Sequence, residues 1–382
     1  MRSYPCGHWW NEASHPSRVW IVLLVLLVWG CSRQEPLKVG FVGGLTGRLS
    51  DLGTAGRDGV LLAVEEVNRA GGIHGRTITL LVKDDKHSPD EAKRVDQELI
   101  DEGVVAIIGH MTSAMAVAVL PLINEKHVLM IAPTVSSDQV SGIDDYFLRV
   151  TAPSTQEAVR LAQVAYNSKG SRKIVAVFDD SNRSYSLRFV EVFGREFERL
   201  GGNIVKAEAF ASGQDWRPVD IAQMVVAAKP DGVLMVAGAG DAAMFCQQLH
   251  KLGCHASVYL AGWAMTDEFL RTGGPAVEGV VFNHVFDQNN QSPTYLKFKQ
   301  EFLHRFGREP DFAATYSFQA ARVLLEALAK VDVPEPQKLK DAIIKQETFQ
   351  GVQGDFTIDR FGDAQCKRFN VTVSEGRFVT TE

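Results

Sequence analysis

The stretch from residue 37 to residue 85, LKVGFVGGLTGRLSDLGTAGRDGVLLAVEEVNRAGGIHGRTITLLVKDD, decides the fold. It starts with a short apolar run at 39–42 and ends with a second apolar run at 78–82. Between them, from 53 to 70, apolar residues recur three and four positions apart, which is the spacing of one helix face. Gly71 and Gly72 follow, and glycine readily takes the left-handed conformation that ends a helix. The stretch therefore predicts a strand–helix–strand unit.

The same alternation of apolar runs and helical spacing continues through most of the chain. It restarts after the segment FLR at 147–149, so we expect two α/β units of similar plan. Strands that are apolar on both faces and alternate with amphipathic helices imply parallel sheets covered on both sides. The pattern predicts strands at 104–108, 128–131, 174–178, 204–209, 232–236, 258–260, 369–373 and 377–380, and helices at 89–101, 113–125, 155–168, 185–200, 216–228, 241–252, 294–306, 312–330 and 337–345.

The length of 382 residues favours two domains over one. We expect residues 37–150 and 283–353 to form an N-terminal lobe. Residues 151–282 and 354–382 are then expected to form a C-terminal lobe. The sequence contains no flexible linker between them, which favours hinge strands and closure of the lobes over a ligand.

The N-terminus carries the features of an export signal. Arg2 and Arg18 precede an uninterrupted apolar run at 19–29, which is shorter than the roughly 20 residues of a membrane-spanning helix. The run ends in VWGC at 28–31, which resembles the lipobox of bacterial lipoproteins, in which the cysteine is acylated and the chain is cut before it. We therefore predict a signal peptide at 1–30, lipidation of Cys31 and a tether at 31–36. A plain signal anchor with an incidental cysteine is the alternative.

Composition narrows the class of protein further. Apolar residues make up 45% of the chain, which is enough material for two buried cores. The formal net charge of −6 is spread without long runs of one sign, which argues against a nucleic-acid-binding surface.

Loops that follow the predicted strands are the candidate ligand site, because parallel α/β sheets bind ligands beyond the carboxyl ends of their strands. The four loops at 43–53, 109–113, 133–137 and 179–185 are rich in small or hydroxyl residues. Thr112 and Ser113 stand at a helix start, where unpaired N–H groups carry partial positive charge. Together with Ser136, which follows another strand, they would suit a carboxylate. The alternative is that Thr112 or Ser113 only caps its helix.

Short motifs in a fixed order support this interpretation. Together, behind the lipobox, they resemble the branched-chain amino-acid-type periplasmic binding proteins of ABC importers, from about residue 37 to the C-terminus. The motifs are GGLTG at 43–47, NRAGGIHGR at 68–76, DD at 84–85, IGHMTS at 108–113, IAP at 131–133, FLR at 147–149, and DD at 179–180 followed by Tyr185.

The resemblance implies a fold and a function. The implied fold is α/β, the periplasmic-binding-protein-like type I fold, in which two doubly wound parallel-sheet lobes are joined by hinge strands. The implied function is a lipid-anchored receptor in the cell envelope, facing the periplasm or the cell exterior. It would deliver an amino acid or related carboxylate to the permease and ATPase subunits of an importer. The alternative is a ligand sensor of the same fold that signals to a partner protein.

The resemblance also implies roles for individual residues. Ser113 and Ser136 would hold the α-carboxylate of the ligand, with Thr112 beside them and the backbone of Val135 contributing. Tyr185, from the second lobe, would close over the ligand.

The chain departs from the family pattern at 260–263, near Ala239, where a pocket aromatic is missing, and at Leu52. The segment LAGW at 260–263 has no acidic residue where amino-acid binders place one for the ligand's ammonium group. An unpaired buried ammonium is costly, so the ligand lacks one or its cation is held elsewhere. Trp263 would cover a cation, stack on an aromatic ligand or pack in the core. Leu52 replaces a tyrosine of some members, and Phe312 aligns with an aromatic that lines some family pockets or packs a helix on a sheet.

Catalytic and metal-binding patterns are not evident. Cys246 and His250 share a helix face, but the helix ends at Gly253, so we favour Cys246 as a small core residue over a metal ligand. Asp84 and Asp85 are adjacent on a strand and point to opposite faces, which argues against a shared acid–base site. We interpret His87 and His110 as solvated loop or capping residues. The sequence thus predicts a binding protein without enzymatic activity, metal or cofactor.

Overall fold

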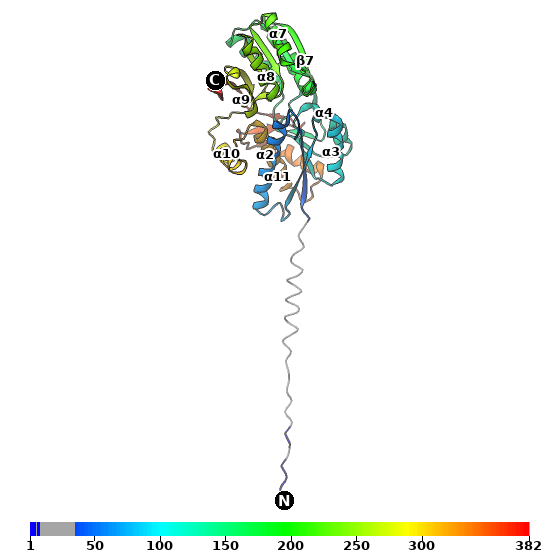
Figure 1. Ribbon diagram of the computed structural model, residues 1–382. Coiled ribbons are helices and arrows are strands. Elements are labelled where there is room, and N and C mark those ends of the chain that lie inside the picture. Colours follow the sequence, from blue (N-terminus) through cyan, green and yellow to red (C-terminus); the bar gives the residue numbers. More distant parts are fainter. Residues whose placement is uncertain (5, 8–34, 215, 382) are drawn as a thin grey trace.

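The computed structural model describes residues 1–4, 6–7, 35–214 and 216–381, and residues 35–381 form two stacked lobes (Figure 1). Cys31 and most of the predicted signal peptide lie outside the described residues. Within the described residues, no helix combines the length and the apolar character that crossing a membrane requires.

The first lobe is built on a five-stranded parallel sheet in the order β2-β1-β3-β4-β5. Helix α11 packs along α2, so a segment from late in the chain completes this lobe (Figure 1). The strands are β1 (Leu37–Gly43), β2 (Ile78–Asp84), β3 (Ala106–Ile108), β4 (Met130–Ala132) and β5 (Phe147–Arg149); the helices are α2 (Ser50–Arg69), α3 (Pro89–Asp101), α4 (Ser113–Glu125), α10 (Pro293–Phe306), α11 (Phe312–Leu328) and α12 (Pro336–Gln346).

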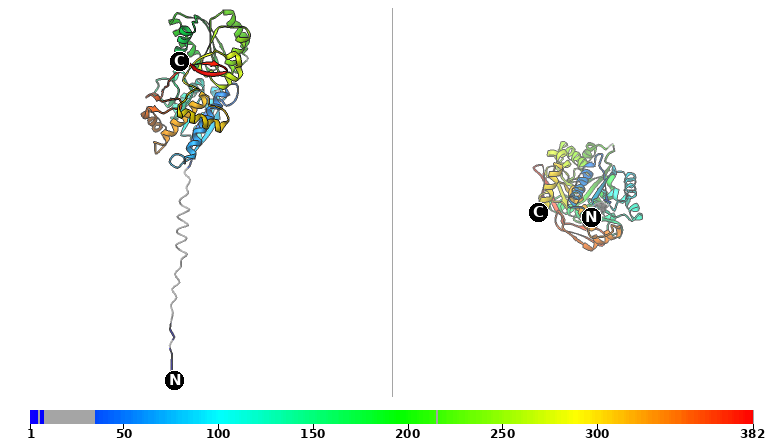
Figure 2. Two further views of the ribbon diagram at one scale, coloured as in Figure 1. Left: turned by 90° about the vertical axis from the view of Figure 1, so that its left-hand side faces the viewer. Right: turned by 90° about the horizontal axis from the view of Figure 1, so that it is seen from below.

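The second lobe is built on a seven-stranded sheet in the order β15-β14-β10-β9-β8-β6-β7. Five strands are parallel, and the C-terminal hairpin β14–β15 adds two antiparallel strands at one edge (Figure 2). The strands are β6 (Lys173–Asp179), β7 (Asn203–Phe210), β8 (Gly232–Val236), β9 (Ser257–Leu260), β10 (Val281–His284), β14 (Phe369–Ser374) and β15 (Arg377–Thr381); the helices are α5 (Thr155–Gln163), α6 (Arg183–Arg199), α7 (Pro218–Ala228), α8 (Ala239–Lys251) and α9 (Asp267–Gly273).

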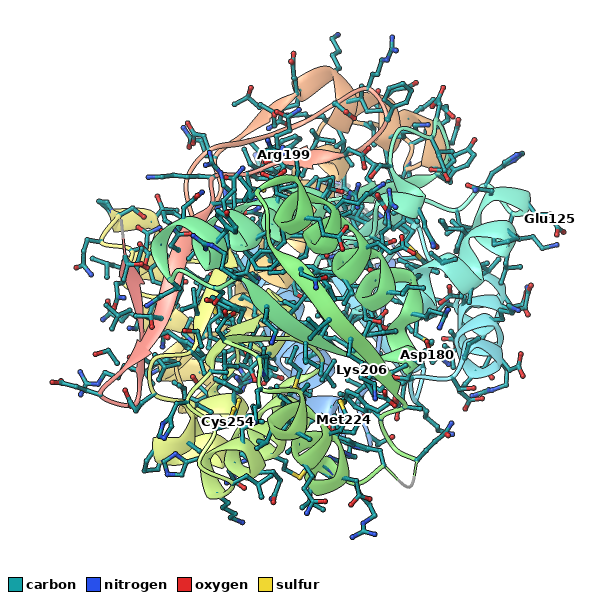
Figure 3. All side chains as sticks on the ribbon, turned by 90° about the horizontal axis from the view of Figure 1, so that it is seen from above. Glu125, Asp180, Arg199, Lys206, Met224 and Cys254 are labelled. Atoms are coloured by element: carbon teal, nitrogen blue, oxygen red, sulfur yellow. The ribbon has the colours of Figure 1, made fainter. Side chains whose placement is uncertain are left out.

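Helices cover both faces of this second sheet. Figure 3 looks down on the lobe: α6, which ends at Arg199, lies on one side of the strands, while α7 with Met224 and α8 before Cys254 lie on the other. This is the doubly wound arrangement that the alternation predicts. Cys246 on α8 is 2% exposed within the core, as predicted, and burial raises the pKa of its thiol to about 12.

The C-terminal hairpin turns where the sequence places Glu375 and Gly376. Their φ angles are 53° and 69°, so both central residues of the turn are left-handed. Such a turn matches the twist of a two-residue hairpin, which favours glycine there.

The chain crosses between the lobes after β5, after β10 and before β14. The expected lobe limit at residue 282 falls inside β10, a strand too short to show a pattern of its own. Strands β11 (Thr348–Phe349), β12 (Phe356–Ile358) and β13 (Ala364–Gln365) form a separate small sheet. The lobe limits given above stay a proposal.

Candidate functional site

A cavity lies between the two lobes, and both lobes supply its walls. The lining residues are Leu52, Met111, Thr112, Ser113, Pro133, Thr134, Ser136, Thr151, Ala152, Glu157, Asn182, Tyr185, Trp263, His284, Val285, Phe312, Tyr316 and Arg368.

Most of the predicted ligand-binding residues lie on this cavity. Val135 is fully buried and is not among the lining residues. The others do line it: Leu52, Thr112, Ser113, Ser136, Tyr185, Trp263 and Phe312. The structure thus brings together residues from α2, α4, α6 and α11 that are far apart in the sequence.

The start of helix α4 forms the first-lobe wall. Thr112 precedes the helix in extended conformation, and its side chain makes no capping hydrogen bond. The hydroxyl of Ser113 accepts a hydrogen bond of 3.2 Å from the backbone N–H of Ser137. In the structure, neither the Thr112 hydroxyl nor the Ser113 hydroxyl therefore caps the helix. Instead, the side-chain oxygen of Asn182, from the second lobe, accepts a 3.0 Å hydrogen bond from the N–H of Ala114.

The loop that carries Ser136 is fixed from behind. The fully buried guanidinium of Arg149 donates to the carbonyl of Ser137 at 2.8 Å and forms an ion pair of 2.6 Å with Asp363. The carbonyl of Ser136 accepts from the backbone N–H of Ser154 at 2.8 Å. With its backbone held in this way, Ser136 lines the cavity.

Aromatic side chains form much of the remaining wall. Tyr185 and Trp263 meet edge to face, with ring centroids 6.1 Å apart. His284 and Phe312 meet in the same way at 4.8 Å. Burial raises the pKa of the Tyr185 hydroxyl well above its ordinary value, so the group stays neutral.

Contacts across the cleft join the lobes. Arg48 forms an ion pair with Asp241, and Asp51 accepts a 2.9 Å hydrogen bond from the hydroxyl of Thr266. In a third contact between the lobes, the hydroxyl of Ser137 donates to the carbonyl of Ser184 at 2.6 Å. The lobes are therefore in a closed arrangement.

Comparison with known proteins identifies the family to which this fold and cleft belong. A family model described as "Periplasmic binding protein" matches residues 36–375. The chain belongs to the periplasmic binding protein family. Membership indicates a location outside the cytoplasm.

Similar proteins include amino-acid-binding proteins and a solute-binding protein solved with an aromatic acid. Leu/Ile/Val-binding protein homolog 1 of Brucella melitensis is 25% identical over 348 residues, which is 90% of this chain and 91% of that protein. A leucine-binding protein from Thermotoga maritima has a TM-score of 0.84 at 25% identity and covers 91% of this chain and 98% of its own. A solute-binding protein from R. palustris, solved with benzoate, has a TM-score of 0.82 at 22% identity, over 90% of this chain and 95% of its own.

This periplasmic binding protein has two charged cavity residues that the sequence analysis missed. Glu157 on α5 accepts a 2.7 Å hydrogen bond from the N–H of Gly262, so a carboxylate reaches the segment at 260–263 that has none of its own. Burial raises the pKa of Glu157 to about 7, with Arg368 opposing the rise. Arg368 lies just before β14, with Nη1 3.5 Å from Glu157 Oε2. No sequence motif marks either residue, because the fold brings them together from 211 positions apart.

His110 is not the solvated or capping residue that the sequence suggested. It is fully buried, with Nδ1 2.7 Å from Asp85 and Nε2 3.2 Å from Asp96. The two carboxylates raise the pKa of His110 to about 10 against the opposing effect of burial. An isolated histidine gives no sequence signal of this kind, since Asp96 comes from the neighbouring helix α3. Asp84 points the other way, toward Leu45 and Thr46, as the strand pattern predicts.

Among the residues that the structure describes, no group of three or more histidine, cysteine, aspartate or glutamate side chains is arranged to hold a metal ion.

Proposed function

We propose that this protein is the receptor of an ABC importer, which closes on a small organic carboxylate and delivers it to the permease and ATPase subunits. The observation that carries the proposal is the cavity between the lobes, whose walls come from both lobes and include the start of α4. The relatives named above are binding proteins, which fits a chain that binds its ligand without turnover. An amino acid or an aromatic acid is the expected class of ligand.

The first lobe is proposed to hold the anionic end of the ligand. The hydroxyls of Thr112, Ser113 and Ser136 line the cavity beside the positive end of the α4 dipole. The backbone of Val135 lies directly before Ser136 and contributes from behind the cavity wall. Hydrogen bonds to a charged acceptor are the stronger class, so this end would supply much of the affinity.

The second lobe is proposed to close over the body of the ligand. Tyr185 and Trp263 form an aromatic corner on that side, and Leu52 and Phe312 add apolar surface from α2 and α11. A ligand that contacts both walls favours the closed arrangement, because it gains those contacts only there. The permease would then recognise the closed form.

The membrane attachment is a separate part of the proposal. We propose that residues 1–30 are removed, that Cys31 is lipidated, and that residues 31–36 tether the lobes to the membrane. Replacing Cys31 by serine should release the protein from the membrane fraction, and mass spectrometry should lose the lipid mass. Retention of the unmodified protein in membranes would contradict a lipid anchor and support a plain signal anchor.

A ligand screen tests the binding function. Thermal-shift measurements on the purified protein should find stabilisation by at least one compound in a panel of amino acids, keto acids, hydroxy acids, aromatic acids and amides. Calorimetry should then give reversible binding with the compound recovered unchanged. No stabilisation by any carboxylate of such a panel would count decisively against the proposal.

A further inference from the structure

We propose that Glu157 and Arg368 form a neutral recognition pair, which selects a ligand whose second polar group is a hydroxyl or a carboxamide and carries no charge. The inference rests on the proposed function, since it concerns the same cavity. It names the chemical class of the ligand: a monocarboxylate with one uncharged group that both donates and accepts hydrogen bonds.

The two charges are built into the wall. Their side chains are 6% and 8% exposed, and both line the cavity. Each is held from behind: Glu157 accepts from the N–H of Gly262 at 2.7 Å, and Arg368 donates from Nη2 to the carbonyl of Pro153 at 2.6 Å. The carboxylate and the guanidinium therefore have fixed directions.

The pair leaves hydrogen-bonding capacity unused. Nη1 of Arg368 and Oε2 of Glu157 are 3.5 Å apart, well beyond the roughly 2.7–2.9 Å of a charge-assisted hydrogen bond. Among the described residues, Nε and Nη1 of Arg368 are buried without a hydrogen-bond partner. Buried donors without partners are costly and rare, so this arrangement points to an acceptor supplied by the ligand.

Above about pH 7, where Glu157 is ionised, the charges of the pair and its neighbours add up to zero. The neighbouring His284 is neutral, because burial and Arg368 lower its pKa to about 3. Tyr185 stays protonated at neutral pH, and the hydroxyl of Tyr316 donates to the carbonyl of Val285 at 3.0 Å. A ligand ammonium placed here would be attracted by Glu157 but repelled by Arg368, and a second carboxylate would meet the reverse. An uncharged group that donates to one residue and accepts from the other gains from both.

The proposal also explains why the segment at 260–263 can lack an acid. The N–H of Gly262 is occupied by Glu157, whose charge Arg368 already balances. An ammonium group would then find no free countercharge, in contrast to a pocket with an unpaired acid.

Two ligand series test this selectivity by calorimetry on the purified protein. One keeps the skeleton of 4-methylpentanoate and places hydrogen, hydroxyl, oxo or ammonium at carbon 2, the last being leucine. The other keeps benzoate and places methyl, hydroxyl, carboxamide, carboxylate or aminomethyl at carbon 4. In at least one series, the hydroxyl or carboxamide member should bind about 10-fold or more tightly than the parent and both charged members. A best ligand that is charged or purely apolar would overturn the inference and leave the proposed function standing. Binding by no member, with none in the wider panel, would overturn both.

Charge variants test whether the pair itself sets the preference. Glu157→Gln leaves Arg368 unbalanced and should move the ranking toward the dicarboxylate. Arg368→Gln leaves Glu157 unbalanced and should move it toward the ammonium compounds. The double variant should return the preference to uncharged groups. Glu198→Gln, on an exposed position of α6, is the matched control and should keep the wild-type ranking. If one single variant does not fold, the other single variant and the ligand ranking of the wild type still decide. An unchanged ranking in either folded single variant would overturn the assignment.

Discussion

Asn182, at the start of α6 in the second lobe, accepts a 3.0 Å hydrogen bond from the backbone N–H of Ala114 in the first turn of α4. The bond joins the two lobes beside Ser113, at the helix start that we propose binds the ligand's carboxylate. Closure and anion binding are therefore coupled at one helix terminus.

Removing this bond should weaken ligand binding without moving the carboxylate site. We expect Asn182→Ala to lower affinity by about 3- to 10-fold, because one neutral hydrogen bond is lost only in the closed form. Calorimetry with the best ligand of the panel measures the effect. An affinity equal to wild type would show that this contact does not contribute to closure.

Removing the hydroxyl of Ser113 should have a larger effect. Ser113→Ala takes away one hydrogen bond to a charged group, worth about 1.5–3 kcal/mol, or roughly 10- to 150-fold in affinity. Ser168→Ala, at an exposed position outside the cavity, is the control. A change below about 3-fold in Ser113→Ala would contradict the carboxylate assignment.

The ion pair between Arg48 and Asp241 should stabilise the closed arrangement of the lobes, and this stabilisation should decrease with salt. Arg48 is 44% exposed, so we expect Arg48→Ala to weaken binding only about 2- to 5-fold, and less at high salt. Arg199→Ala, which removes an ion pair between the exposed Arg199 and Glu196 inside one lobe, should leave affinity unchanged. Equal effects of the two substitutions on affinity would argue against a role of the Arg48–Asp241 pair in closure.

Much of the architecture could be predicted from the sequence because strand and helix patterns are local. Helices α3 and α4 have their predicted bounds. Strands β5 and β10 were missed because each short run ends in polar residues, whereas the equally short β3 and β4 are wholly apolar. Helix α9 was also missed: it is a short segment without an extended apolar face.

The residues of the candidate site likewise fall into those that could be predicted from local sequence and those that could not. Thr112, Ser113 and Ser136 follow predicted strands, so their place on the cavity could be anticipated. Glu157 and Arg368 could not, because one lies inside a helix and the other between short strands of the hinge. Their pairing exists only in three dimensions, as does that of His110 with its two aspartates.

Those aspartates predict a pH dependence of stability. The pKa of His110 rises to about 10 in the folded protein, so the charged form is favoured there. The resulting stabilisation is fully present below about pH 6.5, the ordinary pKa, and is lost as pH rises through about 10. The free energy of unfolding should therefore fall more between pH 7 and pH 10 in the wild type than in His110→Asn. Parallel profiles from urea unfolding would contradict a charged His110.

The buried pair of Arg149 and Asp363 should matter for stability. Asp363→Ala leaves a fully buried cation without its partner, which costs about 3–5 kcal/mol of unfolding free energy. Asp355→Ala, at an exposed position of the same segment, should change it by less than about 0.5 kcal/mol. A loss below about 1 kcal/mol in Asp363→Ala would show that the pair is not needed to hold the loop of Ser136.

The central claim is that the two lobes close on a carboxylate held at the start of α4. A crystal structure with the tightest ligand of the panel tests it most directly. The account predicts a carboxylate oxygen within about 2.6–3.2 Å of the hydroxyls of Ser113 and Ser136, with the rest of the ligand facing Tyr185 and Trp263. A ligand bound outside the cavity, or one whose carboxylate lies on Arg368 instead, would contradict it.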